Sequence, residues 1–215
     1  MILINFTIYK ETFGDRALEF AEICKRVSQK SGVRIIPVVS ALDAVRIKEK
    51  TGMEVFLQAV DEYSDGAKSG FVSPFQAEAL KIDGSLINHS EHKIKPGTVK
   101  KILENYPKNF KSVVCIGSLG QADGWAKSIK PDWIAYEPKE FIGNKDKSVA
   151  SEKPDIIRKM VERYPDIPVL VGAGIHSKED VKASLKLGAK GVLIATFIMK
   201  AKDPEKELTE VASAF

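Results

Sequence analysis

The sequence predicts an α/β protein in which eight parallel strands and their outer helices form a single (β/α)8 barrel over residues 1–215. Short apolar runs alternate along the chain with helical patterns, which is typical of repeated strand–helix units around a parallel sheet. The runs are almost continuous in Val, Ile and Leu, as in strands covered on both faces. There are eight of them, the number that closes such a barrel.

The elements follow one another in a regular order. Helical stripes fill the gaps between strands, and Gly52, Gly188 and the Tyr164–Pro165 pair are helix stops. A chain of 215 residues is shorter than the typical barrel of about 250 residues, so we expect several short helices, residues 73–80 among them. The strands are predicted at residues 2–6, 33–38, 54–58, 84–88, 112–116, 132–136, 167–171 and 191–195. The clearest stripes are Ala17, Phe20, Ala21, Cys24 and Val27, then Val99, Ile102, Leu103 and Tyr106, then Ile156, Ile157, Met160, Val161 and Tyr164.

Composition excludes several classes of protein. The chain is 44% hydrophobic and 29% charged, as folded globular proteins are, and its net charge of +4 comes from lysines scattered among acids. We therefore expect no binding to nucleic acid. Apolar runs such as residues 191–199 are far shorter than the roughly 20 residues of a membrane span, and no signal-peptide pattern develops, so we expect no membrane association and a cytoplasmic location. Cys24 and Cys115 have no metal or redox spacing and are expected to be reduced core thiols.

Polar and small residues follow several strands at their carboxyl ends, where barrels of this class carry their chemistry. A carboxylate base and an imidazole that polarises an oxygen are the groups needed to move a proton beside a carbonyl. Small residues after the last two strands favour a phosphate site made of backbone N–H groups. The residues in question are Asn5, Phe6 and Thr7, then His89, then Glu137, then Gly174, and finally Ala195 and Thr196.

Each of these residues also has a plainer interpretation. A lone histidine is more often structural, and a lone glutamate at a strand end is more often solvated. Gly172 and Gly174 can form an ordinary tight turn. A catalytic role for the histidine and the glutamate is favoured only because they follow different strands whose carboxyl ends lie at the same end of the barrel.

Three motifs extend this interpretation. Residues 87–91 read Ile-Asn-His-Ser-Glu, residues 135–138 read Ala-Tyr-Glu-Pro and precede Ile142 and Gly143, and residues 171–175 read Val-Gly-Ala-Gly-Ile. With these motifs the chain closely resembles triosephosphate isomerase of the short archaeal type, a TIM barrel, and the resemblance runs from end to end. It also includes Asn5 and Phe6, Cys115, and residues 200–204.

The resemblance implies roles for these residues. Glu137 would be the base that moves a proton between two substrate carbons, and His89 the neutral electrophile at the substrate oxygens, the pairing known in this family. Substrate contacts are implied for Asn5, Phe6 and the Thr7 position. Ile142 and Gly143 match a loop that closes on the substrate phosphate, whereas Gly174, Ala195 and Thr196 match its backbone-held phosphate site. The implied substrate is a small phosphorylated triose, with no metal and no organic cofactor.

Three positions depart from the family pattern. The family carries a lysine where this chain has Thr7, and a hydroxyl supplies no charge to an anionic site; Lys10 either compensates or is an ordinary surface residue. Phe197 replaces a small residue and either narrows the phosphate pocket or packs into the core. At residues 144–147 the Gly-rich loop tip becomes Asn-Lys-Asp-Lys, which either slows closure or brings in a positive charge.

Two functions therefore remain open. One is isomerisation of dihydroxyacetone phosphate and glyceraldehyde 3-phosphate, with activity reduced by the missing lysine. The other is a catalytically weak or inactive homologue that binds sugar phosphate or serves as a partner subunit. Residues 61–73 resemble a loop that reaches into a neighbouring subunit, which implies a homodimer or homotetramer; the alternative is a free surface loop.

Overall fold

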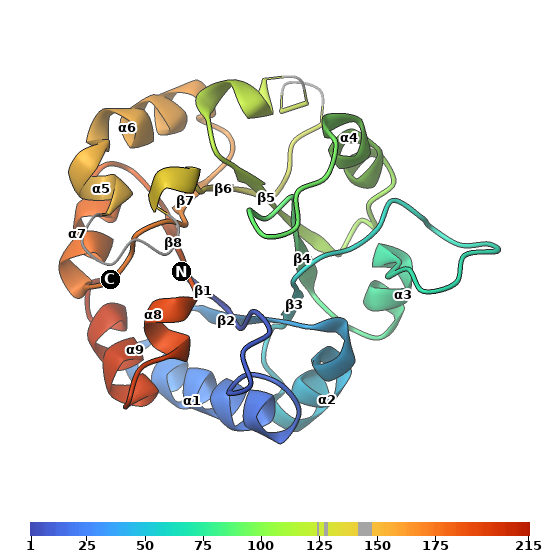
Figure 1. Ribbon diagram of the computed structural model, residues 1–215, viewed down its shortest axis with the longest axis horizontal. Coiled ribbons are helices and arrows are strands. Elements are labelled where there is room, and N and C mark those ends of the chain that lie inside the picture. The colour runs from blue at the N-terminus through green and yellow to red at the C-terminus, as the bar shows by residue number, and fades with distance from the viewer. Residues whose placement is uncertain (124, 127–128, 142–147) are drawn as a thin grey trace.

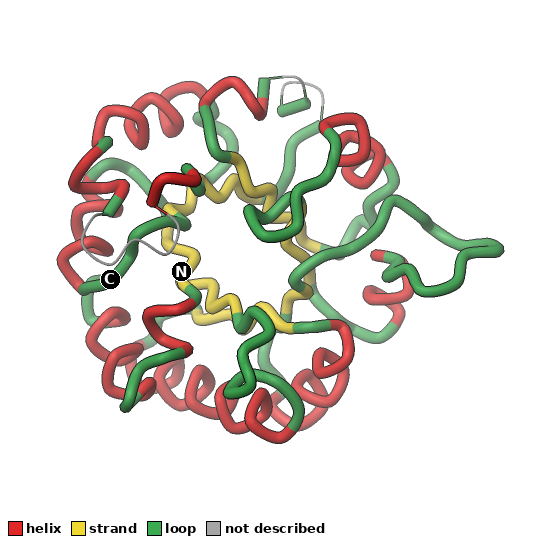
Figure 2. Tube along the Cα trace, viewed as in Figure 1, coloured by secondary structure: helices red, strands yellow, loops and turns green. Residues whose placement is uncertain are grey.

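The computed structural model describes residues 1–215 except residues 124, 127–128 and 142–147. Eight parallel strands pair in sequence order, and β1 closes the barrel by pairing with both β2 and β8 (Figure 1). Helices form a ring outside the strands (Figure 2). The predicted fold class is confirmed. The strands are β1 (Ile2–Asn5), β2 (Ile35–Val39), β3 (Phe56–Leu57), β4 (Gly84–Ile87), β5 (Lys111–Ile116), β6 (Trp133–Tyr136), β7 (Val169–Val171) and β8 (Gly191–Ile194).

Several helices are short, as the length of the chain predicts. Residues 73–80 form only α3, whose Ser73 hydroxyl accepts from the N–H of Phe75 and caps the helix. None of the helices in the described ranges is both long and apolar enough to cross a membrane. The α-helices are α1 (Asp15–Ser31), α2 (Ala41–Thr51), α3 (Pro74–Ala79), α4 (Pro96–Glu104), α5 (Val149–Glu152), α6 (Pro154–Arg163), α7 (Lys178–Lys186), α8 (Thr196–Met199) and α9 (Pro204–Ala212), and the 3-10 helices are η1 (Leu119–Ala122) and η2 (Lys139–Phe141).

Alternation along the strands separates two apolar cores. In β1, Leu3 points into the barrel, whereas Ile2 and Ile4 pack outward against the helices. The inner core contains mostly aliphatic side chains together with Phe56 and the thiol of Cys115. Cys24 lies in the outer core, and both cysteines are buried and free of a disulfide, as predicted.

Some predicted strands are longer than the observed ones, for local reasons. Val33 donates its N–H to the Ser31 hydroxyl at 3.2 Å, so β2 begins only at Ile35. Val55 donates to the Asp83 carboxylate at 2.8 Å instead of to a neighbouring strand, which shortens β3. These side chains accept hydrogen bonds from backbone N–H groups that would otherwise pair with a neighbouring strand. The spacing of apolar residues in the sequence does not reveal such contacts.

Candidate active site

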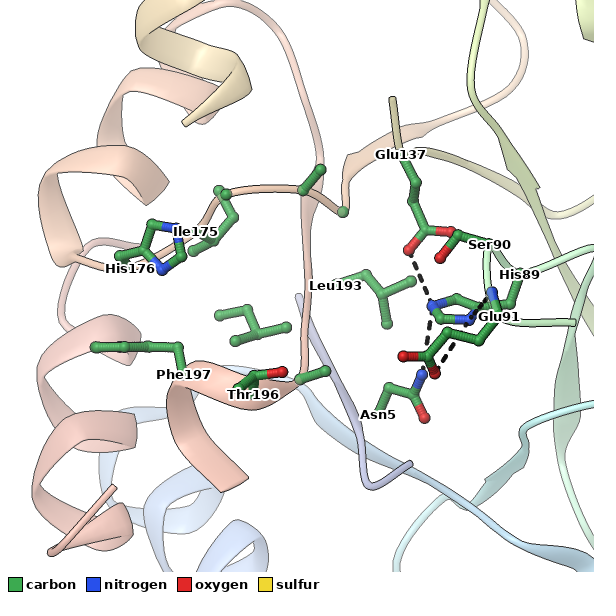
Figure 3. A pocket seen from close by; sticks show the side chains of 15 residues that line it. Asn5, His89, Ser90, Glu91, Glu137, Ile175, His176, Leu193, Thr196 and Phe197 are labelled. Carbon is green, nitrogen blue, oxygen red and sulfur yellow. Dashed lines mark hydrogen bonds and ion pairs between the residues drawn. The ribbon is translucent and has the colours of Figure 1, made fainter. Parts of the chain in front are cut away.

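The same alternation decides which strand-end residues face the barrel mouth. Residues two positions beyond an inward-pointing strand residue continue on its face and line a cavity at the carboxyl end of the barrel (Figure 3). These pairs are Leu3 with Asn5, Ala135 with Glu137, Leu170 with Gly172, and Leu193 with Ala195. His89, Gly174 and Thr196 also line this cavity, so it brings together most of the residues singled out in the sequence.

His89 and Glu137 face each other across this cavity. The His89 Nε2 lies 3.2 Å from the Glu137 Oε1, and the glutamate side chain is only 2% exposed. Its second oxygen, Oε2, is buried and accepts no hydrogen bond from the described residues. A buried carboxylate oxygen without a donor is costly in free energy, and it is available to a ligand.

A backbone contact selects one form of the His89 ring. The N–H of Glu91 donates to His89 Nδ1 at 3.3 Å, which is possible only when Nδ1 carries no proton. The ring proton is then on Nε2, the atom that faces Glu137; the Asn5 amide nitrogen, 3.4 Å from Nε2, is itself a donor, so in this tautomer that contact is not a hydrogen bond. Nε2–H can therefore donate to an oxygen in the cavity.

Glu137 also perturbs the ionisation of His89. Burial lowers the pKa of His89, but the hydrogen bond to Glu137 and the negative charge of that carboxylate outweigh burial and raise the pKa above its ordinary value of 6.5. In the ligand-free protein this opposes the neutral ring that the resemblance implies. A substrate lying between the two side chains would remove the contact that raises the pKa.

We expect the His89 imidazole of the ligand-free protein to titrate above pH 6.5, and Glu137→Gln to lower its pKa, because burial then acts without the opposing charge. Since the folded-state pKa is raised, the stabilisation from this pair is complete below pH 6.5 and is lost as pH rises through the folded-state pKa. NMR titration of the three imidazoles in the chain measures this directly. An identical His89 pKa in both proteins would contradict the assignment.

Gly172 packs directly against the catalytic candidate Glu137. A Cβ added at Gly172 would lie 2.7 Å from the Glu137 Cγ and 3.1 Å from its Oε1. We expect Gly172→Ala to displace the carboxylate and to lower kcat by about tenfold or more, because small misplacements of a reacting group are costly. The matched control is Gly120→Ala, whose added Cβ meets nothing within 4 Å. Steady-state kinetics with a thermal unfolding curve for each variant checks this; equal kcat for Gly172→Ala and wild type would contradict it.

The loops after β7 and β8 contain backbone donors that have no partner among the described residues. Gly174 has φ 67°, a left-handed conformation that favours glycine. Among the described residues, the backbone N–H groups of Gly174 and Ile175 donate no hydrogen bond. Thr196 and Phe197 begin α8, and the first N–H groups of a helix have no partner within it. These groups can together bind an oxyanion.

Phe197 combines both interpretations left open by the sequence. Its ring is partly buried against the barrel–helix core, yet it also lines the cavity. It packs edge-on against His176, with ring centroids 6.3 Å apart, and points away from His89 and Glu137 (Figure 3). Phe197 therefore forms the far wall of the cavity and does not lie between His89 and Glu137.

Comparisons with known proteins identify the family of this chain. The family model described as triosephosphate isomerase matches residues 1–214. This chain belongs to the triosephosphate isomerase family. Proteins named triosephosphate isomerase from Methanothermus fervidus and Methanocaldococcus jannaschii are each 36% identical to it, over 216 and 220 residues, covering 98% of this chain and 96% and 98% of their own lengths. A relative of that name from Metallosphaera sedula is 35% identical over 214 residues, which is 98% of this chain and 93% of its own.

Thr7 adopts an unusual conformation for a β-branched residue in this member of the triosephosphate isomerase family. Its φ is 52°, in the left-handed region. The Thr7 N–H donates to the Asn5 side-chain oxygen at 3.1 Å, and its carbonyl accepts from Gln58 Nε2 at 2.8 Å. Its hydroxyl is buried without a partner among the described residues. Thr7 lines a neighbouring hollow that shares Asn5, His89 and Glu91 with the main cavity.

No described residue lining the main cavity is a lysine or arginine. Lys10, the compensating residue considered from sequence, is exposed and lines neither hollow. The only cavity-lining side chains in the described part that can become cationic are His89 and His176.

The remaining predicted site residues have different outcomes. Phe6 is fully buried in the outer core, where its ring packs against Phe20 at 5.4 Å, because it follows the inward-facing Asn5 by one residue. Its side chain is thus placed away from the cavity, contrary to the substrate contact expected for it. Ile142, Gly143 and the loop tip at 144–147 lie outside the described residues. Sequence reasoning missed His176, although its place two residues beyond Gly174 is a usable signal.

Proposed function

We propose that this protein interconverts dihydroxyacetone phosphate and glyceraldehyde 3-phosphate. The observation that carries the proposal is the 3.2 Å approach of His89 to Glu137 in a cavity of a member of the triosephosphate isomerase family. At the far end of this cavity are backbone N–H groups without a partner within the described ranges. A three-carbon substrate that displaces the direct contact between His89 and Glu137 would have the carboxylate beside its carbons and the imidazole beside its oxygens, while the N–H groups hold its phosphate.

Proton transfer follows from these positions. Glu137 removes a proton from the hydroxyl-bearing carbon next to the carbonyl of dihydroxyacetone phosphate and returns it to the neighbouring carbon. Meanwhile the Nε2–H of His89 donates to the carbonyl oxygen, on which negative charge develops; this oxygen gains a proton and ends as a hydroxyl, and the former hydroxyl oxygen gives up its proton and ends as the aldehyde carbonyl. The amide nitrogen of Asn5 lies 3.4 Å from His89 Nε2, so its N–H can donate to the same oxygen. Binding at the phosphate end is assigned to Gly174, Ala195 and Thr196, with Ile142 and Gly143 as the closing loop.

The absence of lysine and arginine among the described lining residues supports the second candidate, a weak or inactive homologue that binds sugar phosphate or serves as a partner subunit. Fixed positive charge commonly stabilises anionic transition states, and Thr7 supplies none. This second candidate is tested by comparing the binding of a sugar phosphate with the turnover of the triose phosphates.

Assays with purified protein in both directions, with solvent-deuterium exchange into dihydroxyacetone phosphate, test the main proposal. Turnover together with deuterium incorporation supports it. Calorimetric binding of glycerol phosphate without turnover or exchange supports the second candidate instead. Absence of both overturns both sugar-phosphate functions and leaves a partner subunit.

We also propose a homodimer or homotetramer assembled through the loop between β3 and α3, which extends away from the barrel (Figure 1). The base of this loop is fixed by Asp61, whose N–H donates to the Val72 carbonyl and whose carboxylate accepts from the Val72 N–H. Phe71, near the carboxyl end of this loop, is 46% exposed. Ile8, which follows β1, is 83% exposed, and Leu42, which follows β2, is 94% exposed. An exposed aromatic ring on a projecting loop supports an interface there, because aromatic residues are enriched in interfaces. Sedimentation velocity of wild type and Phe71→Asp tests this; a wild-type monomer would overturn it.

A cytoplasmic location belongs to the same proposal. Its support is that Cys24 and Cys115 are both buried free thiols, and that burial raises the pKa of Cys24 to about 12, so it stays protonated and unreactive.

A further inference from the structure

His176 occupies a defined place at the far end of the cavity. It follows Gly174 and Ile175 in the loop between β7 and α7, and its side chain lines the cavity (Figure 3). Its backbone N–H donates to the Asp180 carboxylate at 3.1 Å, and the same carboxylate accepts from the Ser177 hydroxyl at 2.8 Å. The loop that carries His176 is therefore fastened to the first turn of α7.

The imidazole itself is positioned but not satisfied. Phe197 packs edge-on against the ring, which restricts the directions in which it can point. The Nε2 of His176 is buried and has no hydrogen-bond partner among the described residues. A buried polar atom without a partner costs free energy, so in native proteins it usually serves a ligand, a water molecule or a mechanism.

The charge of the cavity makes an anion the favoured ligand for this atom. His176 directly follows Gly174 and Ile175, whose N–H groups donate to no partner in the described part of the chain. A phosphate held by these neutral donors would carry nearly two negative charges, and no described lysine or arginine lines the cavity to balance them. An imidazole can donate from Nε2 and can also carry a positive charge.

We propose that His176 binds the phosphate group of the substrate through Nε2, completing the backbone site of Gly174, Ala195 and Thr196 with a side-chain donor able to carry charge. This inference rests on the proposed function, because it assigns a ligand to one end of the same cavity. It makes Phe197 a positioning residue for His176.

The experiment compares three proteins with wild type: His176→Leu, His176→Gln and, as the matched control, His92→Gln. Gln keeps an N–H donor near the position of Nε2 but no charge, whereas Leu keeps neither. His92 is exposed and does not line the main cavity. Calorimetry with inorganic phosphate measures affinity, steady-state kinetics measures KM and kcat, and thermal unfolding shows whether each variant is folded.

We expect His176→Leu to weaken phosphate binding about 10- to 100-fold, as for loss of a hydrogen bond to a charged group, and to raise KM with a smaller change in kcat. His176→Gln should recover part of that loss, and His92→Gln should match wild type. In wild-type protein, inorganic phosphate should shift the imidazole NMR signals that disappear in His176→Gln.

Unchanged phosphate affinity in a folded His176→Leu variant, or His176 signals that phosphate does not shift, would overturn the proposal. Should His176→Leu fail to fold, the NMR shift in wild-type protein still decides. The two proposals also fail separately. Normal isomerase activity with a phosphate-insensitive His176 overturns this inference alone, whereas phosphate binding through His176 without any turnover overturns the isomerase function alone.

Discussion

Glu137→Gln is expected to lower kcat by about 10²- to 10⁴-fold, the usual contribution of a positioned general base. Glutamine has nearly the same shape, so it fits the 2%-exposed site and can still accept a hydrogen bond from His89 Nε2. It cannot take a proton from carbon. KM should change little, because the backbone N–H groups proposed to hold the phosphate are untouched.

The matched comparison for this variant is Glu91→Gln. Among the described residues, Glu91 is the other carboxylate that lines the cavity, but its side chain is 58% exposed. The backbone N–H of Glu91 donates to His89 Nδ1, and the substitution leaves that hydrogen bond in place. We therefore expect a much smaller effect. Rates within about threefold of wild type for Glu137→Gln would show that another group moves the proton, since a general base contributes far more than that.

Thr7→Lys is expected to raise the rate of isomerisation by about 10²-fold, the magnitude associated with one preorganised donor at a developing oxyanion. The hollow around Thr7 contains Asn5, His89 and Glu91, so an ammonium group there would meet a carboxylate and lie beside the reacting imidazole. The backbone at this position is already held in its left-handed conformation by bonds to Asn5 and Gln58.

Thr7→Met is the control, because it lengthens the side chain without adding charge. An increase with lysine and none with methionine assigns the effect to electrostatics. A wild-type rate in Thr7→Lys would mean that charge at this position is not limiting, and the shortfall attributed to Thr7 would then be wrong.

The sequence predicts the eight strands because each is an uninterrupted apolar run, and it predicts that His89 and Glu137 meet because parallel strands present their carboxyl ends on one side. The strand limits depend on capping contacts instead. The Asp83 carboxylate accepts a hydrogen bond from the N–H of Val55, 28 residues earlier in the chain, and no local sequence pattern predicts that contact.

Other parts of the site depend on which way a loop side chain turns. Loops have no period that separates inward from outward positions, so neither the buried Nε2 of His176 nor the direction of Phe197 follows from the sequence. The closeness of Gly172 to Glu137 is likewise a tertiary contact, since a glycine in a turn looks the same whether it meets solvent or a carboxylate. By contrast, the outward position of Phe6 could have been inferred, because it follows the inward-facing Asn5 on an alternating strand.

Closure of the barrel between its first and last strands sets an order of events during synthesis. Ile2 pairs with Val192, so one edge of β1 stays open until the segment of β8 has left the ribosome. At about 5–20 residues per second that wait lasts roughly 10 to 40 s, and an open strand edge is a template for pairing with other chains. A nascent chain released before Gly191 would keep two open edges, on β1 and β7, and is expected to aggregate instead of persisting as a partial barrel.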